Sequence, residues 1–323
     1  MTGIVIVTWN SEEVIGACLD ACLPLSAVEI VVIDNASVDR TVELARERKG
    51  VKVIANMENR GFAAACNQGF AAVPNSSAIL LLNPDAVLES GFHKLGAQVA
   101  EPGVGGATGR LVDDVDGQTQ RGFGLRRLPT PMALALEVLG LNKLLPWNPV
   151  NRRWRMADYN DEVPGFVEQP AGAFLMVRRE AWEAVGGLDE SFWPAWFEDV
   201  DLCLRLRRAG YSIRYIPDAV AKHRGGHSAS RLKWADRQLF WYGNLLRYSV
   251  KHFAPIGRKL VAGAVMFACV PRTVASMFSG QHLSSARVYS RVFRVACAAW
   301  RGSTPRFRVE GPPSREEKRA RRF

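Results

Sequence analysis

Residues 78–88 of this 323-residue chain read Ala-Ile-Leu-Leu-Leu-Asn-Pro-Asp-Ala-Val-Leu. An apolar run of strand length that ends abruptly at Asn83-Pro84-Asp85 is typical of a buried parallel strand. Because proline cannot continue a central strand, the chain must leave the sheet where Asp85 appears. Ligands bind at this carboxyl edge of open α/β sheets, and a carboxylate there can hold a divalent cation together with substrate phosphates. The alternative is a turn in which Asp85 only caps a helix expected near residues 88–100.

The composition suits a globular fold of one or two domains. Of the residues, 48% are hydrophobic and 23% are charged, so disorder of the whole chain is excluded. Six scattered cysteines predict neither a disulfide framework nor a zinc site and favour a reducing cytosol. The chain begins with a strand pattern at Gly3–Thr8 without a basic flank, so we expect no signal peptide. We also expect no transmembrane helix, because the longest apolar run, 260–270, is followed by Pro271.

The net charge of +10 is unevenly distributed. Residues 231–323 hold 19 Lys and Arg against 4 Asp and Glu, whereas residues 1–230 hold 23 against 28. An acidic body with a basic tail predicts an anionic partner surface, either lipid headgroups or nucleic acid. Two tail segments, 234–253 and 260–278, are aromatic and basic by turns, as in helices that lie in a membrane interface. An ordinary helical subdomain or a dimer contact is the alternative.

The first part of the chain alternates strands with helices. We expect strands at Ile4–Thr8, Val28–Ile33 and Val51–Ala55, which predicts a parallel sheet with right-handed crossovers. Asp34 ends the second strand as Asp85 ends its own, so it is a candidate for hydrogen-bonding a base or a ribose. Arg60 and Gly61 precede a helix N-terminus, where phosphate could bind, although Arg60 could equally be a surface charge.

The middle of the chain has weaker patterns. The glycine cluster at 103–109 is not a dinucleotide motif, because Pro102 rather than a strand precedes it and no helical pattern follows. We expect a strand at 110–112 and a hairpin turn at Asp116-Gly117 instead. Residues 125–165 lose periodicity and carry five prolines, so we interpret them as an irregular functional loop or lid, with acceptor recognition as the preferred role.

Three carboxylates crowd the start of a later helix: Glu198, Asp199 and Asp201 follow Trp193, Trp196 and Phe197. The helix dipole alone favours acids there, but an aromatic cleft is also a setting in which a carboxylate can serve as general base. A strand at 169–177 and a helix at 179–185 precede this stretch. A last strand, 212–216, precedes His223 and His227 in a glycine-rich loop, where a metal or phosphate contact is credible.

Taken in order, these motifs resemble the family-2 glycosyltransferases with the nucleotide-sugar-binding GT-A fold. The matching pieces cover about residues 3–230 and are Thr8-Trp9-Asn10, Asp34-Asn35-Ala36-Ser37, Asn59-Arg60-Gly61-Phe62, Leu82-Asn83-Pro84-Asp85, Gly187-Leu188-Asp189-Glu190, Phe197-Glu198-Asp199-Val200-Asp201-Leu202 with Arg205, and His223 before Gly226 and Ser228. The resemblance implies an α/β fold with a mainly parallel central sheet flanked by helices, plus a C-terminal helical basic extension. We expect a catalytic domain at 1–230, a membrane-associating or dimerising extension at 231–310 and a disordered basic tail at 311–323.

The resemblance also implies a reaction, the transfer of a sugar from a nucleotide diphosphate donor to an acceptor hydroxyl with inversion at the anomeric carbon. By position, Asp199 or Glu198 would deprotonate the acceptor, and Asp85 with His223 would hold a divalent metal, Mg2+ or Mn2+. The implied donor-binding residues are Thr8, Asn10, Asp34, Asn35, Arg60, Gly61, Asn83 and Asp85, and the implied acceptor-binding residues are Gly172, Trp196 and Asp201. The Asn-Pro-Asp sequence departs from the Asp-x-Asp form of many relatives, so metal coordination would depend on His223 and the phosphates.

Within the family, the Asn-Pro-Asp form, the length and the tail look most like bacterial rhamnosyltransferases. These include enzymes that add rhamnose from dTDP-rhamnose to N-acetylglucosaminyl-diphospho-polyprenol in mycobacterial-type cell walls. The resemblance implies a cytoplasmic enzyme on the inner face of the cell membrane, with a lipid-linked acceptor, a homodimer as one option and no nucleic-acid partner. Two alternatives stay open: a transferase of the same fold that uses a UDP-sugar, and a non-catalytic membrane or nucleic-acid scaffold. The scaffold hypothesis must treat four carboxylates as accidental: Asp34, Asp85, Glu198 and Asp199. Known nucleic-acid modules are also absent from the sequence.

Overall fold

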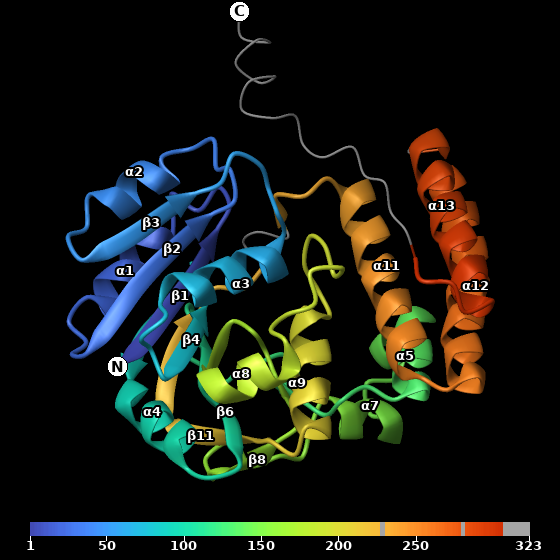
Figure 1. Ribbon diagram of the computed structural model, residues 1–323. Helices are drawn as coiled ribbons and strands as arrows, with labels where there is room; N and C mark the ends of the chain where they lie inside the picture. Colours follow the sequence, from blue (N-terminus) through green and yellow to red (C-terminus); the bar gives the residue numbers. More distant parts are fainter. Residues whose placement is uncertain (227–229, 279–281, 306–323) are drawn as a thin grey trace, which may run out of the picture.

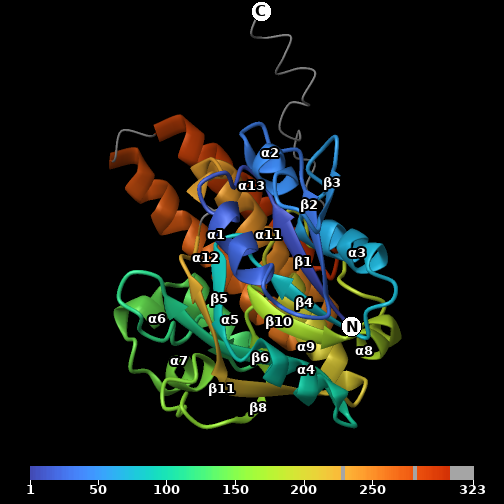
Figure 2. The ribbon, with the colours of Figure 1, turned by 90° about the vertical axis from the view of Figure 1, so that its left-hand side faces the viewer.

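The computed structural model describes residues 1–226, 230–278 and 282–305, which form a helix-covered sheet with a group of helices at one end (Figures 1 and 2). The nine-stranded sheet has the order β3-β2-β1-β4-β10-β6-β11-β5, with β8 paired to β11. Its parallel half consists of β1 (Thr2–Thr8), β2 (Val28–Asp34), β3 (Val51–Ala55) and β4 (Ala78–Leu82). Its mixed half consists of β10 (Phe174–Arg178), β6 (Val104–Asp113), β11 (Ser212–His223), β5 (Ala86–Ser90) and β8 (Gly165–Val167). The predicted α/β architecture is confirmed.

Helices cover both faces of the sheet. One face buries the apolar sides of α1 (Ile15–Cys22), α2 (Thr41–Arg46) and α4 (Phe92–Ala100). The other face buries those of α3 (Phe62–Ala72), α8 (Arg179–Val185) and α9 (Glu198–Arg208). Because both faces are covered, a central strand can be apolar throughout, and every residue of β4 is buried.

A third apolar cluster joins the C-terminal helices to the rest of the molecule. It is formed by α11 (Trp234–His252), α12 (Pro255–Phe278), α13 (His282–Trp300), α5 (Pro131–Val138) and α7 (Pro149–Trp154). Side chains of α9 pack against the same cluster, so these helices are not a detached unit. Among the residues that the structure describes, no helix is long and apolar enough to cross a membrane. The tail predicted at 311–323 lies outside the described residues.

Two elements differ from expectation because the chain bends without leaving the sheet. After Pro84 the chain forms β5 rather than a helix, and α4 begins only after Gly91, which turns the backbone at φ +69°. β11 extends beyond Ile216 to His223. Pro217 falls within an irregularity of the pairing between β11 and β6, where its missing N–H is tolerated.

The glycine cluster lies in a strand, which agrees with its rejection as a dinucleotide motif but was not itself predicted. β6 begins earlier than the predicted 110–112 and runs through the glycines from Val104. Gly109 allows β11 to approach closely, because a Cβ at this position would lie only 2.0 Å from the carbonyl oxygen of Ala219.

The expectation of an irregular segment at 125–165 was wrong. The segment contains α5, α6 (Leu141–Leu144) and α7, and it starts with β7 (Leu125–Arg126), which pairs with β9 (Gln169–Pro170). Thr130 caps α5 and Asn148 caps α7, each followed by proline at the first helical position. These helices are too short for hydrophobic periodicity to reveal them, and only the cap–proline pairs signal them in the sequence.

Candidate active site

A cavity of about 470 Å3 lies at the carboxyl edge of β1 and β4, where the sequence predicts the ligand site. Its walls come from the sheet, from α9 and α11, and from the segment that carries β7, α5 and α7. Nine of the predicted site residues line it: Thr8, Asn35, Asn83, Asp85, Gly172, Trp196, Glu198, Asp199 and His223. The other five are Asn10, Asp34, Arg60, Gly61 and Asp201, and these do not line it.

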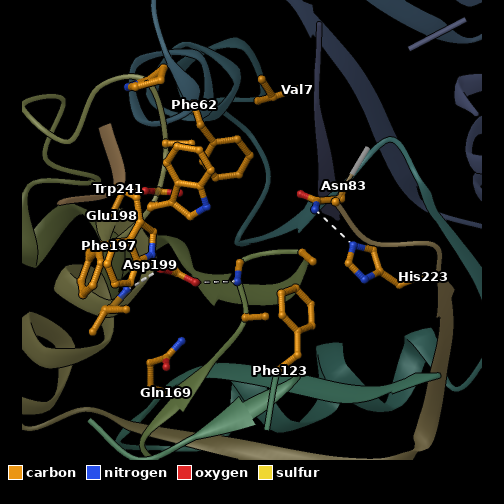
Figure 3. Close-up of a pocket in the computed structure, with 18 of the residues that line it drawn as sticks. Val7, Phe62, Asn83, Phe123, Gln169, Phe197, Glu198, Asp199, His223 and Trp241 are labelled. Atoms are coloured by element: carbon orange, nitrogen blue, oxygen red, sulfur yellow. Dashed lines mark hydrogen bonds between the residues drawn. The ribbon is translucent and has the colours of Figure 1, made fainter. Parts of the chain in front are cut away.

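One wall of the cavity presents Asp85 and His223. The antiparallel pairing of β5 with β11 sets His223 opposite Ala86, next to Asp85. Nε2 of His223 lies 3.5 Å from Oδ1 of Asp85, and both side chains are almost completely buried. Figure 3 shows His223 facing Asn83, whose Nδ2 lies 3.4 Å from the same ring nitrogen.

Gln120 fixes which nitrogen of His223 carries the proton. Nε2 of Gln120 donates to the backbone carbonyl of His223 at 2.7 Å, and a carbonyl can only accept, so the amide has one orientation. Its Oε1 then accepts a hydrogen bond from Nδ1 of His223 at 2.9 Å. With the proton on Nδ1, the lone pair of Nε2 points toward Asp85. Phe123 stacks on the imidazole with ring centroids 5.3 Å apart, which further restricts its orientation.

These two side chains fit a divalent cation. A carboxylate oxygen and an unprotonated imidazole nitrogen are both metal ligands, and ligating histidines commonly donate their other N–H to an oxygen acceptor. Within the described ranges, no group of three or more His, Cys, Asp and Glu side chains could hold a metal ion. Mg2+ does not require such a group, because one or two carboxylates commonly bind it together with substrate phosphates and water. His227, predicted beside His223, lies outside the described residues.

The opposite wall presents Asp199 in the first turn of α9 (Figure 3). Val200 N donates to its Oδ1 at 2.8 Å and Gly172 N donates to its Oδ2 at 3.2 Å, so the carboxylate is held in one orientation. Burial raises the pKa of Asp199 above its ordinary range, against the opposing effect of these two N–H groups. A raised pKa makes this carboxylate a better proton acceptor, as a general base requires.

The two residues before α9 have strained backbones. Trp196 has φ 75° and Phe197 has φ 72°, values that bulky L-residues rarely adopt. Both line the cavity, and together they turn the chain into α9 so that Asp199 faces the same space. Such strain costs about 1–3 kcal/mol per residue and concentrates at functional sites.

Glu198 lies beside Asp199 but is more enclosed. Its side chain is buried, and its Oε2 has no hydrogen-bond partner among the residues that the structure describes. Burial, together with the charge of Asp199, raises the pKa of Glu198 well above its ordinary range, which favours the neutral acid. Burial raises the pKa of both carboxyls, and the geometric difference is that two backbone N–H groups orient Asp199 whereas Oε2 of Glu198 has no partner among the described residues.

Asp34 supports the cavity from behind its lining. Its carboxylate is fully buried and accepts hydrogen bonds from Thr8 Oγ1 at 3.0 Å and from Ser37 N at 2.9 Å. The hydroxyl of Ser37 donates to it as well. Asp34 therefore ties the end of β1 to the loop after β2 and fixes Thr8, which does line the cavity.

Three further predicted donor-binding residues also lie outside the lining. Arg60 is exposed, in agreement with the alternative of a surface charge. Asn10 Oδ1 accepts a hydrogen bond from Val38 N at 2.9 Å, and the carbonyl of Gly61 accepts one from Asn35 Nδ2 at 3.1 Å. Asn10 and Gly61 thus hold the loops from which the lining residues project.

Asp201 lies on the side of α9 away from the cavity and not in the acceptor wall as expected. Its carboxylate accepts hydrogen bonds from Arg205 Nε at 2.7 Å and His252 Nε2 at 2.6 Å, and it pairs with Lys251 Nζ at 2.7 Å. Arg208, which can only donate, contacts Nδ1 of His252 at 3.0 Å, so His252 is the neutral tautomer with its proton on Nε2. Although burial opposes ionisation, the hydrogen bonds from His252 and Lys251 and the charge of Arg205 lower the pKa of Asp201 to about 2. This network ties α9 to α11.

Several residues at the cavity were not identified by any sequence motif. Arg126 and Trp154 line it from the segment at 125–165 that proline density marked as functional, and Phe123 lines it from just before that segment, but no motif assigned a role to these side chains. Trp241 lines it from α11, in the basic C-terminal part. Gln120 carried no signal at all, because its contact with His223 joins positions 103 residues apart.

Residues 2–244 match the profile of a family described as Glycosyltransferase like family 2. The chain is similar to the N-acetylglucosaminyl-diphospho-decaprenol L-rhamnosyltransferase of Mycobacterium tuberculosis, with 28% identity over 255 residues that cover 69% of this chain and 80% of that protein. It is also similar to rhamnosyltransferase WbbL of Escherichia coli K12, with 24% identity over 258 residues that cover 75% of this chain and 92% of that protein. A crystal structure of GalNAc-T7 with UDP, GalNAc and Mn2+ superposes with a TM-score of 0.60 at 14% identity, over 92% of this chain and 55% of that chain, and this likeness concerns the fold alone.

Proposed function

The chain belongs to glycosyltransferase family 2, and from this premise we propose that it transfers L-rhamnose from dTDP-rhamnose to a hydroxyl of N-acetylglucosaminyl-diphospho-polyprenol in cell-wall polysaccharide synthesis. The choice of sugar and acceptor is supported by the two relatives above, both rhamnosyltransferases by name. The proposed reaction is supported by one observation: the same cavity has Asp199, a carboxylate of raised pKa, on one wall, and Asp85 and His223, whose side chains can bind a metal, on the other.

On the acceptor side, Asp199 takes the proton of the attacking hydroxyl. The hydroxyl oxygen forms a bond to the anomeric carbon on the face opposite the diphosphate, and the bond to the diphosphate breaks with its electron pair on the leaving dTDP. The configuration at the anomeric carbon is therefore inverted. The N–H groups of Gly172 and Val200 keep the Asp199 carboxylate aimed at the cavity during this step. General-base catalysis of this kind contributes roughly 10²- to 10⁴-fold in rate.

On the donor side, Asp85 and His223 would hold Mg2+ or Mn2+, which when bound supplies positive charge to the leaving diphosphate. Gln120 keeps the proton of His223 on Nδ1, so that Nε2 is the nitrogen presented to Asp85. The burial of both side chains excludes bulk water and strengthens electrostatic interactions at this wall.

A thermal-stability screen tests this proposal. We expect dTDP-rhamnose with Mg2+ or Mn2+ to raise the melting temperature more than UDP-sugars do, because a ligand that binds only the folded state stabilises it. A selective response to a UDP-sugar such as UDP-galactofuranose or UDP-N-acetylglucosamine would keep the reaction type and replace the donor. No response to any nucleotide, and no release of nucleoside diphosphate from any donor, would favour the non-catalytic scaffold.

We also propose that α12 brings the protein to the inner face of the cell membrane. The residues of its outer face are apolar and exposed and recur at spacings of three, four and seven: Ile256, Leu260, Phe267, Val270 and Val274. Exposed cations stand on α12 and on α13, which packs beside it: Lys259, Arg287 and Arg294. An apolar stripe with neighbouring cations suits an anionic lipid surface, which is where a polyprenyl-linked acceptor resides.

Vesicle flotation tests the membrane contact. Phe267→Glu combined with Val270→Glu should abolish flotation with vesicles that contain phosphatidylglycerol, because it places two negative charges in the stripe. Val115→Glu is a matched control, since Val115 is 90% exposed and lies on the hairpin after β6, outside the C-terminal helices. A double variant that floats like the wild type would refute the contact. A double variant that instead converts a dimer to a monomer would assign the stripe to a second copy of the chain.

A further inference from the structure

Arg126 is an enclosed cation with no carboxylate partner among the described residues. It lies on β7 and lines the cavity, and its Nε donates to the carbonyl of Gly122 at 2.5 Å. Its guanidinium carbon lies 5.5 Å from the ring centre of Trp154, and that of Arg155 lies 5.3 Å from the same ring. Burial, and then the charge of Arg155, lower the pKa of Arg126. The fold thus encloses a positive charge that forms no ion pair with a described carboxylate, although the charges of Asp199 and Glu137 act on it.

The neighbouring arginines of the same segment do have partners. Arg121 bonds to Asp161 at 2.5 Å, and Arg155 bonds to Glu137 at 3.0 Å. Arg155 and Glu137 line the cavity as Arg126 does, so of the two arginines that line it from this segment Arg155 has an ion pair and Arg126 has none among the described residues. A guanidinium binds phosphate oxygens through two parallel hydrogen bonds, so an unpaired one in a cavity wall favours a phosphate-bearing ligand.

Arg126 stands on the acceptor side of the cavity. The pairing of β7 with β9 sets Arg126 opposite Gln169, and Gly172, just after β9, donates to Asp199. The carboxylates whose charges act on Arg126 are those of Asp199 and Glu137. An anion bound to Arg126 would therefore lie near the proposed base.

We propose that Arg126 binds the diphosphate of a lipid diphosphate acceptor. The inference rests on the proposed function and assigns one part of that acceptor to one side chain. Besides the charged Glu137 and Arg155, the cavity lining includes apolar and aromatic side chains that suit the first isoprene units of a polyprenyl chain: Pro129, Leu134, Trp154, Trp196 and Trp241. The donor also carries a diphosphate, so the experiment has to separate the two sources.

Binding without transfer tests this assignment. Full-length wild type, Arg126→Gln and Arg126→Lys are titrated by calorimetry with farnesyl diphosphate, with farnesol, and with dTDP in the presence of Mn2+. We expect Arg126→Gln to weaken farnesyl diphosphate binding on the order of 10- to 100-fold, the effect of losing a charge-assisted hydrogen bond, and to leave dTDP affinity unchanged. Arg126→Lys retains the charge and should lose less. Arg152→Gln is the matched control, because Arg152 pairs with Asp158 outside the cavity.

Two other results of the binding experiment would overturn the assignment of Arg126 to the acceptor diphosphate. Equal binding of farnesol and farnesyl diphosphate by the wild type would show that no diphosphate subsite exists. Loss of dTDP affinity in Arg126→Gln, with farnesyl diphosphate unaffected, would move Arg126 to the donor. The reaction itself is judged separately by transfer assays. Absence of rhamnosyl transfer would refute the proposed donor without altering the binding result, whereas normal transfer with an unchanged acceptor KM in Arg126→Gln would refute the subsite alone.

Discussion

Asp201→Asn should destabilise the protein strongly, although Asp201 does not line the cavity. A change in the pKa of an aspartate from its ordinary 3.8 to about 2 favours the folded, ionised form by roughly 2 kcal/mol. Asparagine removes this contribution and leaves Arg205 without its anion, whereas Lys251 keeps its ion pair with Asp189. We therefore expect a loss of roughly 2–4 kcal/mol in the free energy of unfolding, which overlaps the roughly 3–5 kcal/mol typical of breaking a buried ion pair.

Urea unfolding followed by tryptophan fluorescence measures this loss. Because the pKa of Asp201 is depressed in the folded state, its stabilisation is fully present above about pH 4 and disappears as the pH falls toward 2. The difference between wild type and Asp201→Asn should thus be constant from neutral pH to about pH 5 and shrink below about pH 4. Asp20→Asn is the matched control, since Asp20 forms a two-bond pair with Arg48 at the surface and should cost under about 1 kcal/mol. Equal costs for the two variants, or a difference that grows in acid, would refute the reasoning.

Two more substitutions separate the roles proposed at the two walls. Asp199→Asn should lower kcat roughly 10²- to 10⁴-fold, while the donor still raises the melting temperature. Glu198→Gln mimics the neutral acid and should lower kcat far less. Equal losses of kcat in steady-state assays of the two variants would refute the assignment of Asp199 as the base. The wild-type rate should also fall in acid at a pH above the ordinary pKa of aspartate, because burial raises the pKa of Asp199. Gln120→Leu should weaken Mn2+-dependent binding of dTDP roughly 10- to 100-fold in calorimetry, because His223 is then no longer held in one orientation. Gln118 is exposed on the same hairpin, so Gln118→Leu is the control and should leave this binding unchanged.

The strand ends were predictable because their signals are local. The apolar run of residues 78–82 stops at a proline, so both the buried strand and the place of Asp85 at the sheet edge follow from adjacent residues. The sequence also contained the information needed to separate Asp199 from Asp201. Residues two apart on a helix point about 200° away from each other, so these two carboxylates could not face one cavity.

Contacts between distant segments could not be predicted in this way. Gln120 reaches His223 only because the hairpin after β6 folds back beside the end of β11, and no spacing in the sequence encodes that approach. Arg126 owes its place to the pairing of β7 with β9, which is two residues long and too short to leave a periodic pattern. Single-sequence reasoning therefore found the carboxylates at element ends and missed the side chains that orient or complement them.

The contribution of Trp241 to the cavity restricts how this protein can be recombined with its relatives. A chimera joined at residue 230 would exchange α11 together with α12 and α13, and so would replace part of the cavity wall along with the proposed membrane-facing stripe. It would also pair a foreign helix with Asp201, whose partners Lys251 and His252 lie at the end of α11. A junction after His252, in the short connection before α12, leaves both intact and exchanges only the outer two helices.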